Sequence, residues 1–144
     1  MGTDFSATAA RAIECSAALA VELDASVSCV HAYDGGPPAP LGSDAGPSLL
    51  EHLEESVAPM RIRFPMLRID CVVRRGIPWD KLMNVATEVG ADLIVVGASG
   101  EHEGRQPSFL GRVAMRLAAT TTRAVLVVPR VDEGSPPSIA DGHI

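Results

Sequence analysis

Glycines that follow an apolar run are the residues of this sequence best suited to chemistry. The run Leu93–Val96 ends in Gly-Ala-Ser-Gly, and another glycine follows after ten further residues. Glycine lets backbone N–H groups approach an anion closely, and the positive end of a following helix adds to the attraction. The segment therefore fits either a phosphate site or a tight turn, and the residues leave both interpretations open. The candidate contacts are Gly97, Ser99, Gly100, Gly111, Arg112 and Val113.

Other reactive side chains form no complete catalytic set. Ser99 is a nucleophile by type and His102 is a base, but no orienting group or strained elbow motif accompanies them. Asp4 lacks the further acidic residues and the lysine that a phospho-accepting receiver domain uses. We therefore expect no enzymatic activity. The three cysteines, Cys15, Cys29 and Cys71, are predicted to be small buried hydrophobes in a reducing compartment. Their spacing is not that of a zinc site.

The candidate site residues must be held in place by helices and strands, and the sequence pattern predicts that these elements alternate along the chain. Apolar spacing predicts helices over 6–24, 49–64, 78–89 and 108–119, with Ser6 as the first N-cap. Strands are predicted at Val27–Tyr33, Leu67–Arg74, Leu93–Val96 and Ala124–Val128, with a loop over 34–47.

This alternation predicts an α/β fold with an open parallel sheet of four to five strands flanked by helices, Rossmann-like in type. Ligands of such sheets bind beyond the carboxyl ends of the strands, where the glycines stand. Residues 1–130 are expected to form one domain, and the Pro- and Gly-rich residues 131–144 a disordered tail.

The amino-acid composition and net charge limit the kinds of molecule that we expect the protein to bind. Apolar residues make up 47% of the chain, aromatic residues 3%, and the net charge is −6. Phosphate-backbone binding needs a basic face, so we expect no nucleic-acid partner. The sequence shows no apolar run near the ~20 residues of a membrane span and no visible signal peptide. We expect a cytoplasmic protein without membrane contact.

Several segments together resemble the universal stress protein family. The resemblance rests on Ala91–Gly100 with Gly111, on Ala124–Pro129, on Thr3–Ser6 before an Ala-rich helix, and on Gly76–Pro78. It covers residues 3–130. It implies a nucleotide-binding α/β fold with strand order 3-2-1-4-5 that is often dimeric, and a stress-response role.

The resemblance also implies site residues. Asp4 matches a residue near the adenine and ribose, and His31 and Ala32 match the end of a strand that lines the base pocket. The glycines match a phosphate loop, so ATP or a related adenine nucleotide is the implied ligand, with Mg²⁺ expected beside ATP.

Three departures from the family pattern accompany this resemblance. The spacer before Gly111 is one residue longer, and Arg112 replaces a Ser or Thr whose hydroxyl would contact phosphate. An arginine there can attract phosphate or point into solvent. The family's first strand, an apolar run just before Asp4, is missing. A truncated start, a four-stranded sheet and a strand donated by another chain all remain open, and Asp4 is expected on a loose terminus.

Two functions follow from the sequence. The first is a regulatory domain that binds an adenine nucleotide without fast turnover. The alternative is a nucleotide-free interaction module that acts as a dimer. The last strand motivates it, because this strand is expected at an edge yet is apolar throughout, and apolar edges are normally paired or covered. We predict antiparallel pairing of two copies through Ala124–Pro129.

Overall fold

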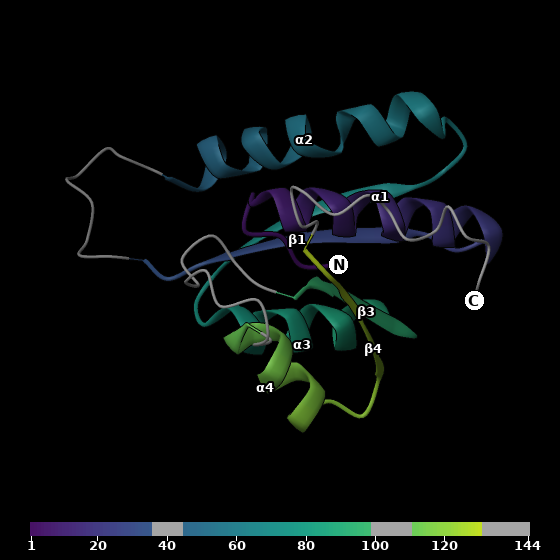
Figure 1. The fold of residues 1–144 in the computed structure, drawn as a ribbon. Helices are drawn as coiled ribbons and strands as arrows, with labels where there is room; N and C mark the ends of the chain where they lie inside the picture. The colour runs from purple at the N-terminus through teal and green to yellow at the C-terminus, as the bar shows by residue number, and fades with distance from the viewer. Residues whose placement is uncertain (36–44, 99–110, 131–144) are drawn as a thin grey trace.

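The computed structural model describes residues 1–35, 45–98 and 111–130, with α2 described without the side chains of residues 45–47 (Figure 1). Helices and parallel strands alternate along these residues, in open sheets of the Rossmann-like type. Their bounds are α1 (Ala7–Glu22), β1 (Val27–Tyr33), α2 (Ala45–Arg63), β2 (Ile69–Arg75), α3 (Pro78–Val89), β3 (Leu93–Gly97), α4 (Arg112–Thr120) and β4 (Ala124–Val128).

The strands form two parallel pairs. β1 pairs with β2 from Val27 opposite Ile69, and β3 pairs with β4 from Leu93 opposite Ala124. In β1 only Cys29 and Val30 are buried, and in β2 only Ile69 is buried, whereas Ile94–Val96 of β3 are all buried. The second pattern is that of a strand covered on both faces.

The first three residues lie between the two pairs. Gly2 N–H donates to the Val95 carbonyl over 2.9 Å, and Thr3 N–H donates to the Val30 carbonyl over 2.9 Å. Gly2 and Val30 form a parallel bridge. The order across the molecule is therefore β2, β1, Met1–Thr3, β3, β4. β1 and β3 are not forced to pair directly, and the expectation that Asp4 sits on a loose terminus is wrong, because the residues just before it are hydrogen-bonded on both sides.

Local signals explain most of the helix ends. Ser6 is the N-cap of α1, where its side chain accepts from Ala9 N–H over 3.1 Å. Pro78 stands at the start of α3, and Gly90 ends it with φ +64°, a left-handed conformation that glycine adopts without steric cost. These ends were predicted from the sequence and are confirmed.

The helices cover both faces of the strands (Figure 1). α1 and α2 lie on one face, and α3 and α4 lie on the other. The first layer buries apolar residues that include Ile13, Leu53 and Val57, and the second includes Val85 and Leu117. Cys29 is buried as predicted, while Cys15 and Cys71 are half-buried, and all three thiols are free.

Several predicted bounds differ from the structure. β2 begins at Ile69 rather than Leu67, because Leu67 N–H donates to the Phe64 carbonyl and so belongs to the preceding turn. α2 begins at Ala45, inside the predicted loop. The predicted start of the last helix at 108 and the predicted disordered tail lie outside the described residues. In the part of the chain that the structure describes, every helix is too short or too polar to cross a membrane.

Candidate functional site

The candidate site lies where β1 and β3 end and α1 and α4 begin. Gly97 closes β3 and packs against the first turn of α1. A Cβ on Gly97 would stand 2.8 Å from Thr8 Cγ2, which is inside the normal contact distance. The glycine therefore lets the start of α1 approach the carboxyl end of β3.

Asp4 stands in a tight turn between the bridging residues and α1. Its Oδ1 accepts from Ser6 N–H over 3.0 Å, and Thr3 Oγ1 accepts from Phe5 N–H over 3.1 Å. Phe5 has φ 65°, an uncommon backbone conformation for a side chain of its size. These two short-range hydrogen bonds hold the half-buried Asp4 carboxylate at the carboxyl edge of the strands.

His31 joins this turn to β1. Its Nδ1 lies 2.8 Å from the Thr3 carbonyl, which can only accept, so Nδ1 carries the proton. The His31 ring lies 4.4 Å from the Phe5 ring, and Phe5 meets His52 of α2 edge-on at 4.2 Å. The sequence analysis missed Phe5 and His52, because their proximity to His31 depends on how α2 packs.

The start of α4 meets the end of β3. Gly111 N–H donates to the Ala98 carbonyl, so the two ends of the glycine segment lie together. Gly111 is the N-cap of α4 and is buried, and it supplies no capping side chain to the N–H groups of the first turn. A helix start of this kind attracts anions.

The structure brings most of the predicted residues to one edge. Asp4 and His31 meet through Thr3, and Gly97 and Gly111 meet through Ala98. Arg112 is exposed, and the Val113 side chain packs against the core instead of facing the edge. Ala32 is half-buried beside Arg74 of β2. Ser99 and Gly100 lie outside the described residues, as do Glu101 and Glu103.

The Cys29 and Cys71 thiols are poor nucleophiles. Burial raises the pKa of Cys29 to about 12, and burial with the nearby Glu54 carboxylate raises that of Cys71 to about 11. Thiolate is the reactive form of cysteine, so neither group is activated near neutral pH. Within the described ranges, no three His, Cys, Asp or Glu side chains gather as a metal-binding group.

The pattern of the universal stress protein family matches residues 1–129 of the chain. The chain belongs to this family. The bridging residues Met1–Thr3 thus lie where the family resemblance implies a first strand. No curated protein matches the chain.

Solved structures of universal stress proteins share the fold. One, a complex with cAMP, is 26% identical, covers 91% of this chain and 94% of its own, and has a TM-score of 0.66. Another, from Archaeoglobus fulgidus, is 22% identical, covers 88% and 94%, and has a TM-score of 0.68. A protein from Arabidopsis thaliana with AMP bound is 20% identical, covers 91% and 83%, and has a TM-score of 0.56.

Proposed function

We propose that this universal stress protein is a cytoplasmic regulatory domain that binds ATP or a related adenine nucleotide at the carboxyl edge of β1 and β3. The observation that carries the proposal is the convergence of the Asp4 turn, the Gly97 strand end and the start of α4, where the N-cap Gly111 brings no capping side chain. A hydrogen-bonding carboxylate and an anion-attracting helix start are complementary to a nucleoside and its phosphates. The 26% identical relative in complex with cAMP supports the same ligand class.

The described residues of the site form two groups, one proposed to contact the adenine and ribose and the other proposed to contact the phosphates. Asp4, His31 and Ala32 stand at the end of β1, on the side proposed for adenine and ribose. The N–H groups at the start of α4 face the proposed phosphate end, and the exposed Arg112 stands beside them as a cation. In this arrangement, the N–H groups at the start of α4 bind phosphate in place of the Ser or Thr hydroxyl of the family pattern.

Mg²⁺ would accompany bound ATP, where it neutralises phosphate charge. We propose binding without fast turnover, because the residues that the structure describes here offer no paired base and nucleophile. A regulatory role then follows from a stable bound state.

Calorimetric titration with ATP and Mg²⁺ tests the proposal. The parent protein is expected to bind with a Kd of about 1–10 µM. Asp4→Asn keeps the oxygen that accepts from Ser6 but removes the charge, so affinity should fall roughly tenfold. Asp70→Asn on exposed β2 is the matched control, because it removes the same charge away from the site and should change nothing.

An Arg112→Ser variant separates two explanations of a negative result. Binding restored only in this variant would mean that the pocket is intact and that Arg112 blocks it. Absence of heat from both proteins would overturn the nucleotide proposal.

A second candidate function rests on β4. Among the described strands β4 pairs with β3 alone, and its sequence is apolar throughout. An apolar edge favours pairing with a second copy. The chain would then act as a nucleotide-free dimeric interaction module in the stress response.

A further inference from the structure

Two cysteines lie side by side on neighbouring strands. Cys29 of β1 and Cys71 of β2 are register partners in the parallel pair, and both thiols are free. Cys29 belongs to the core cluster that α1 and α2 cover, and Cys71 packs against the same cluster. The two side chains therefore occupy adjacent positions on one face of the strand pair.

The spacing of the two backbones fits a disulfide. Neighbouring strands lie about 4.7–4.9 Å apart, and disulfides join Cα atoms that are about 4.4–6.8 Å apart, most often 5.5–6 Å. The pair formed by Cys29 and Cys71 thus falls inside the allowed range, toward its short end. A bond between these residues needs no rearrangement of the strands but carries some strain, and strained disulfides are the more easily reduced ones.

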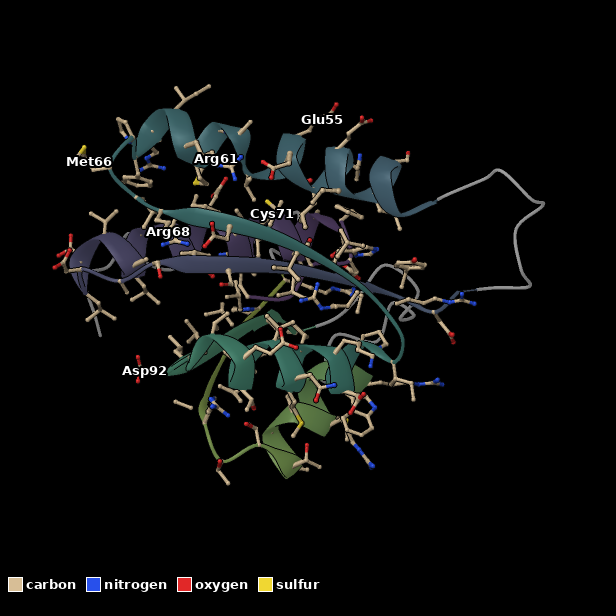
Figure 2. The ribbon with its side chains drawn as sticks, turned by 180° about the vertical axis from the view of Figure 1, so that it is seen from behind. Glu55, Arg61, Met66, Arg68, Cys71 and Asp92 are labelled. Atoms are coloured by element: carbon tan, nitrogen blue, oxygen red, sulfur yellow. The ribbon has the colours of Figure 1, made fainter. Side chains whose placement is uncertain are left out.

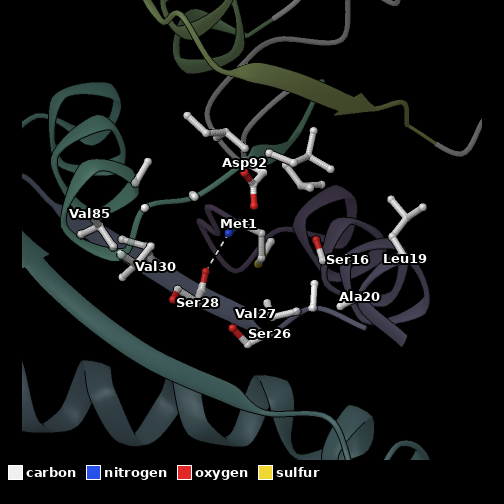
Figure 3. A pocket seen from close by; sticks show the side chains of 18 of the residues that line it. Met1, Ser16, Leu19, Ala20, Ser26, Val27, Ser28, Val30, Val85 and Asp92 are labelled. Carbon is white, nitrogen blue, oxygen red and sulfur yellow. Dashed lines mark hydrogen bonds between the residues drawn. The ribbon is translucent and has the colours of Figure 1, made fainter. Parts of the chain in front are cut away.

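No other thiol competes for Cys29 among the three cysteines, all of which the structure describes. Cys15 packs against a separate core cluster, beside β3 and β4. The Cys29 Sγ also lies 3.1 Å from the Sδ of Met1, whose backbone nitrogen donates to the Ser28 carbonyl over 2.7 Å (Figure 3). A thioether carries no thiol hydrogen, so Met1 cannot form a disulfide. Cys71 is therefore the thiol partner within reach of Cys29.

The two thiols differ in their access to solvent. Cys29 is fully buried, with 0% of its surface exposed. Cys71 is half-buried on β2, which pairs with β1 alone among the described strands. A reagent that arrives from solvent therefore meets Cys71 first, and Cys29 is placed to react with whatever forms on Cys71.

Charged side chains of α2 tune the reactivity of Cys71. Arg61 Nη2 lies 3.8 Å from Cys71 Sγ, and Figure 2 shows the two side chains near each other. Burial raises the pKa of Cys71 to about 11, and the Glu54 carboxylate adds to the rise while the Arg61 guanidinium opposes it. The thiolate fraction is therefore small near neutral pH, but a thiolate of high pKa is a strong nucleophile. Cys71 thus reacts slowly, under sustained rather than brief oxidation.

We propose that Cys29 and Cys71 are a redox site that forms a reversible disulfide with a low-molecular-weight disulfide as oxidant. The Cys71 thiol loses its proton and attacks one sulfur of the reagent, which gives a mixed disulfide and releases one thiol that carries the proton. The Cys29 thiol then loses its proton and attacks Cys71 Sγ, and the second thiol leaves. The two cysteines together lose two electrons, and the reagent is reduced to two thiols. Transient disulfides of this kind are typical of redox sensing in reducing compartments.

Incubation of the folded protein with oxidised glutathione tests the proposal, followed by alkylation of the remaining thiols and peptide mass mapping. We expect one cross-link, between Cys29 and Cys71, which dithiothreitol reverses, and we expect Cys15 to be alkylated. Trypsin leaves Cys15 and Cys29 on one peptide, so a second digestion at Glu22 separates them. The same reaction in urea is the control, because loop closure in the unfolded chain favours the closer pair, Cys15 and Cys29.

Alanine variants assign the role of each thiol. Cys29→Ala should keep glutathione on Cys71 as a stable mixed disulfide, because no second thiol remains to displace it. Cys71→Ala should take up almost no glutathione at the buried Cys29. Cys15→Ala is the matched control and should form the cross-link as fast as the parent. Thermal melting checks that each variant folds, and mass mapping of the parent stands without them.

A charge variant tests whether Cys71 is the attacking thiol. Glu54→Gln removes a carboxylate that raises the pKa of Cys71, so cross-linking should be about twofold to fivefold faster near neutral pH. Glu55→Gln removes the same charge from the exposed side of α2 and should leave the rate unchanged. An unchanged rate in Glu54→Gln would contradict the role of Cys71. If the folded parent forms no bond between Cys29 and Cys71 while the urea control forms its own cross-link, the proposal is wrong.

Discussion

At the scale of single residues, the close contact between Gly97 and Thr8 sets how the end of β3 meets the start of α1 at the candidate site. The strand end and the helix start approach so closely that a Cβ on Gly97 would stand 2.8 Å from Thr8 Cγ2. Thr8 is β-branched and changes rotamer reluctantly, and its backbone carbonyl carbon is also near. A side chain at position 97 would therefore displace the start of α1.

Gly97→Ala is expected to reduce the free energy of unfolding by about 1–3 kcal/mol, because it overpacks this contact. The measurement is urea denaturation. Thr8→Ser removes the methyl group that the new Cβ would meet, so the double variant should regain part of the loss. If the double variant is as unstable as the sum of the two single variants, the clash is not with Thr8 Cγ2.

At the scale of elements, Arg61 ties α2 to β2. It forms an ion pair with Glu54 on its own helix, and its Nη2 donates to the Ile69 carbonyl over 2.8 Å. Figure 2 shows Arg61 on the side of α2 that overlies β2, near Cys71, whereas Glu55 points away. The hydrogen bond from Arg61 holds the pKa of Glu54 below its ordinary value.

This arrangement predicts a pH-dependent contribution to stability. Because the folded-state pKa of Glu54 is lowered, its contribution is present above the unfolded-state pKa and is lost as the pH falls through the folded-state value. Glu54→Gln should reduce the free energy of unfolding by about 0.2–1 kcal/mol near pH 7, since the pair is partly exposed. The difference from the parent should shrink as the pH falls through the lowered folded-state pKa of Glu54.

Glu55→Gln is the matched control, since it removes the same charge from the exposed side of α2. Urea denaturation of both variants at several pH values makes the comparison. A loss that is equal in the two variants would mean that net charge, rather than the Arg61 contact, is responsible.

At the scale of the whole molecule, the two strand pairs are joined by a three-residue bridge, and β4 lies at the outer side of the second pair. Val128 accepts from Ala98 N–H, so Val128 and the alternate residues of β4 turn their backbone groups toward β3. Val125 and Val127 then turn theirs outward, where a second copy would pair.

Sedimentation velocity at micromolar concentration is expected to show a dimer formed through Ala124–Pro129. Val125→Pro removes an outward N–H while leaving the groups that pair with β3, so it should yield a folded monomer. A second-site control, Val72→Pro, would disturb β2 and should leave association unchanged if the protein folds. A monomeric parent, or a dimer that survives Val125→Pro, would contradict pairing through this strand.

The sequence determined most of the elements of this protein. The spacing of apolar residues predicted β1 and β4 at their observed bounds, and Ser6, Pro78 and Gly90 marked helix ends correctly. These features depend on the conformational preferences of neighbouring residues, which the sequence states directly. It also indicated which strand ends carry the candidate site, because parallel strands end at a common edge.

The role of the first residues, and the residues that surround them, became visible only in the folded chain. Met1–Thr3 bind both strand pairs through backbone groups. Because every residue type carries these groups, no side-chain pattern in the sequence indicates that role. The contact of His31 with Phe5, and of Phe5 with His52, likewise depends on residues far apart in the chain. Local sequence determines which segments become helices or strands, but long-range packing decides which surfaces meet and which gaps remain.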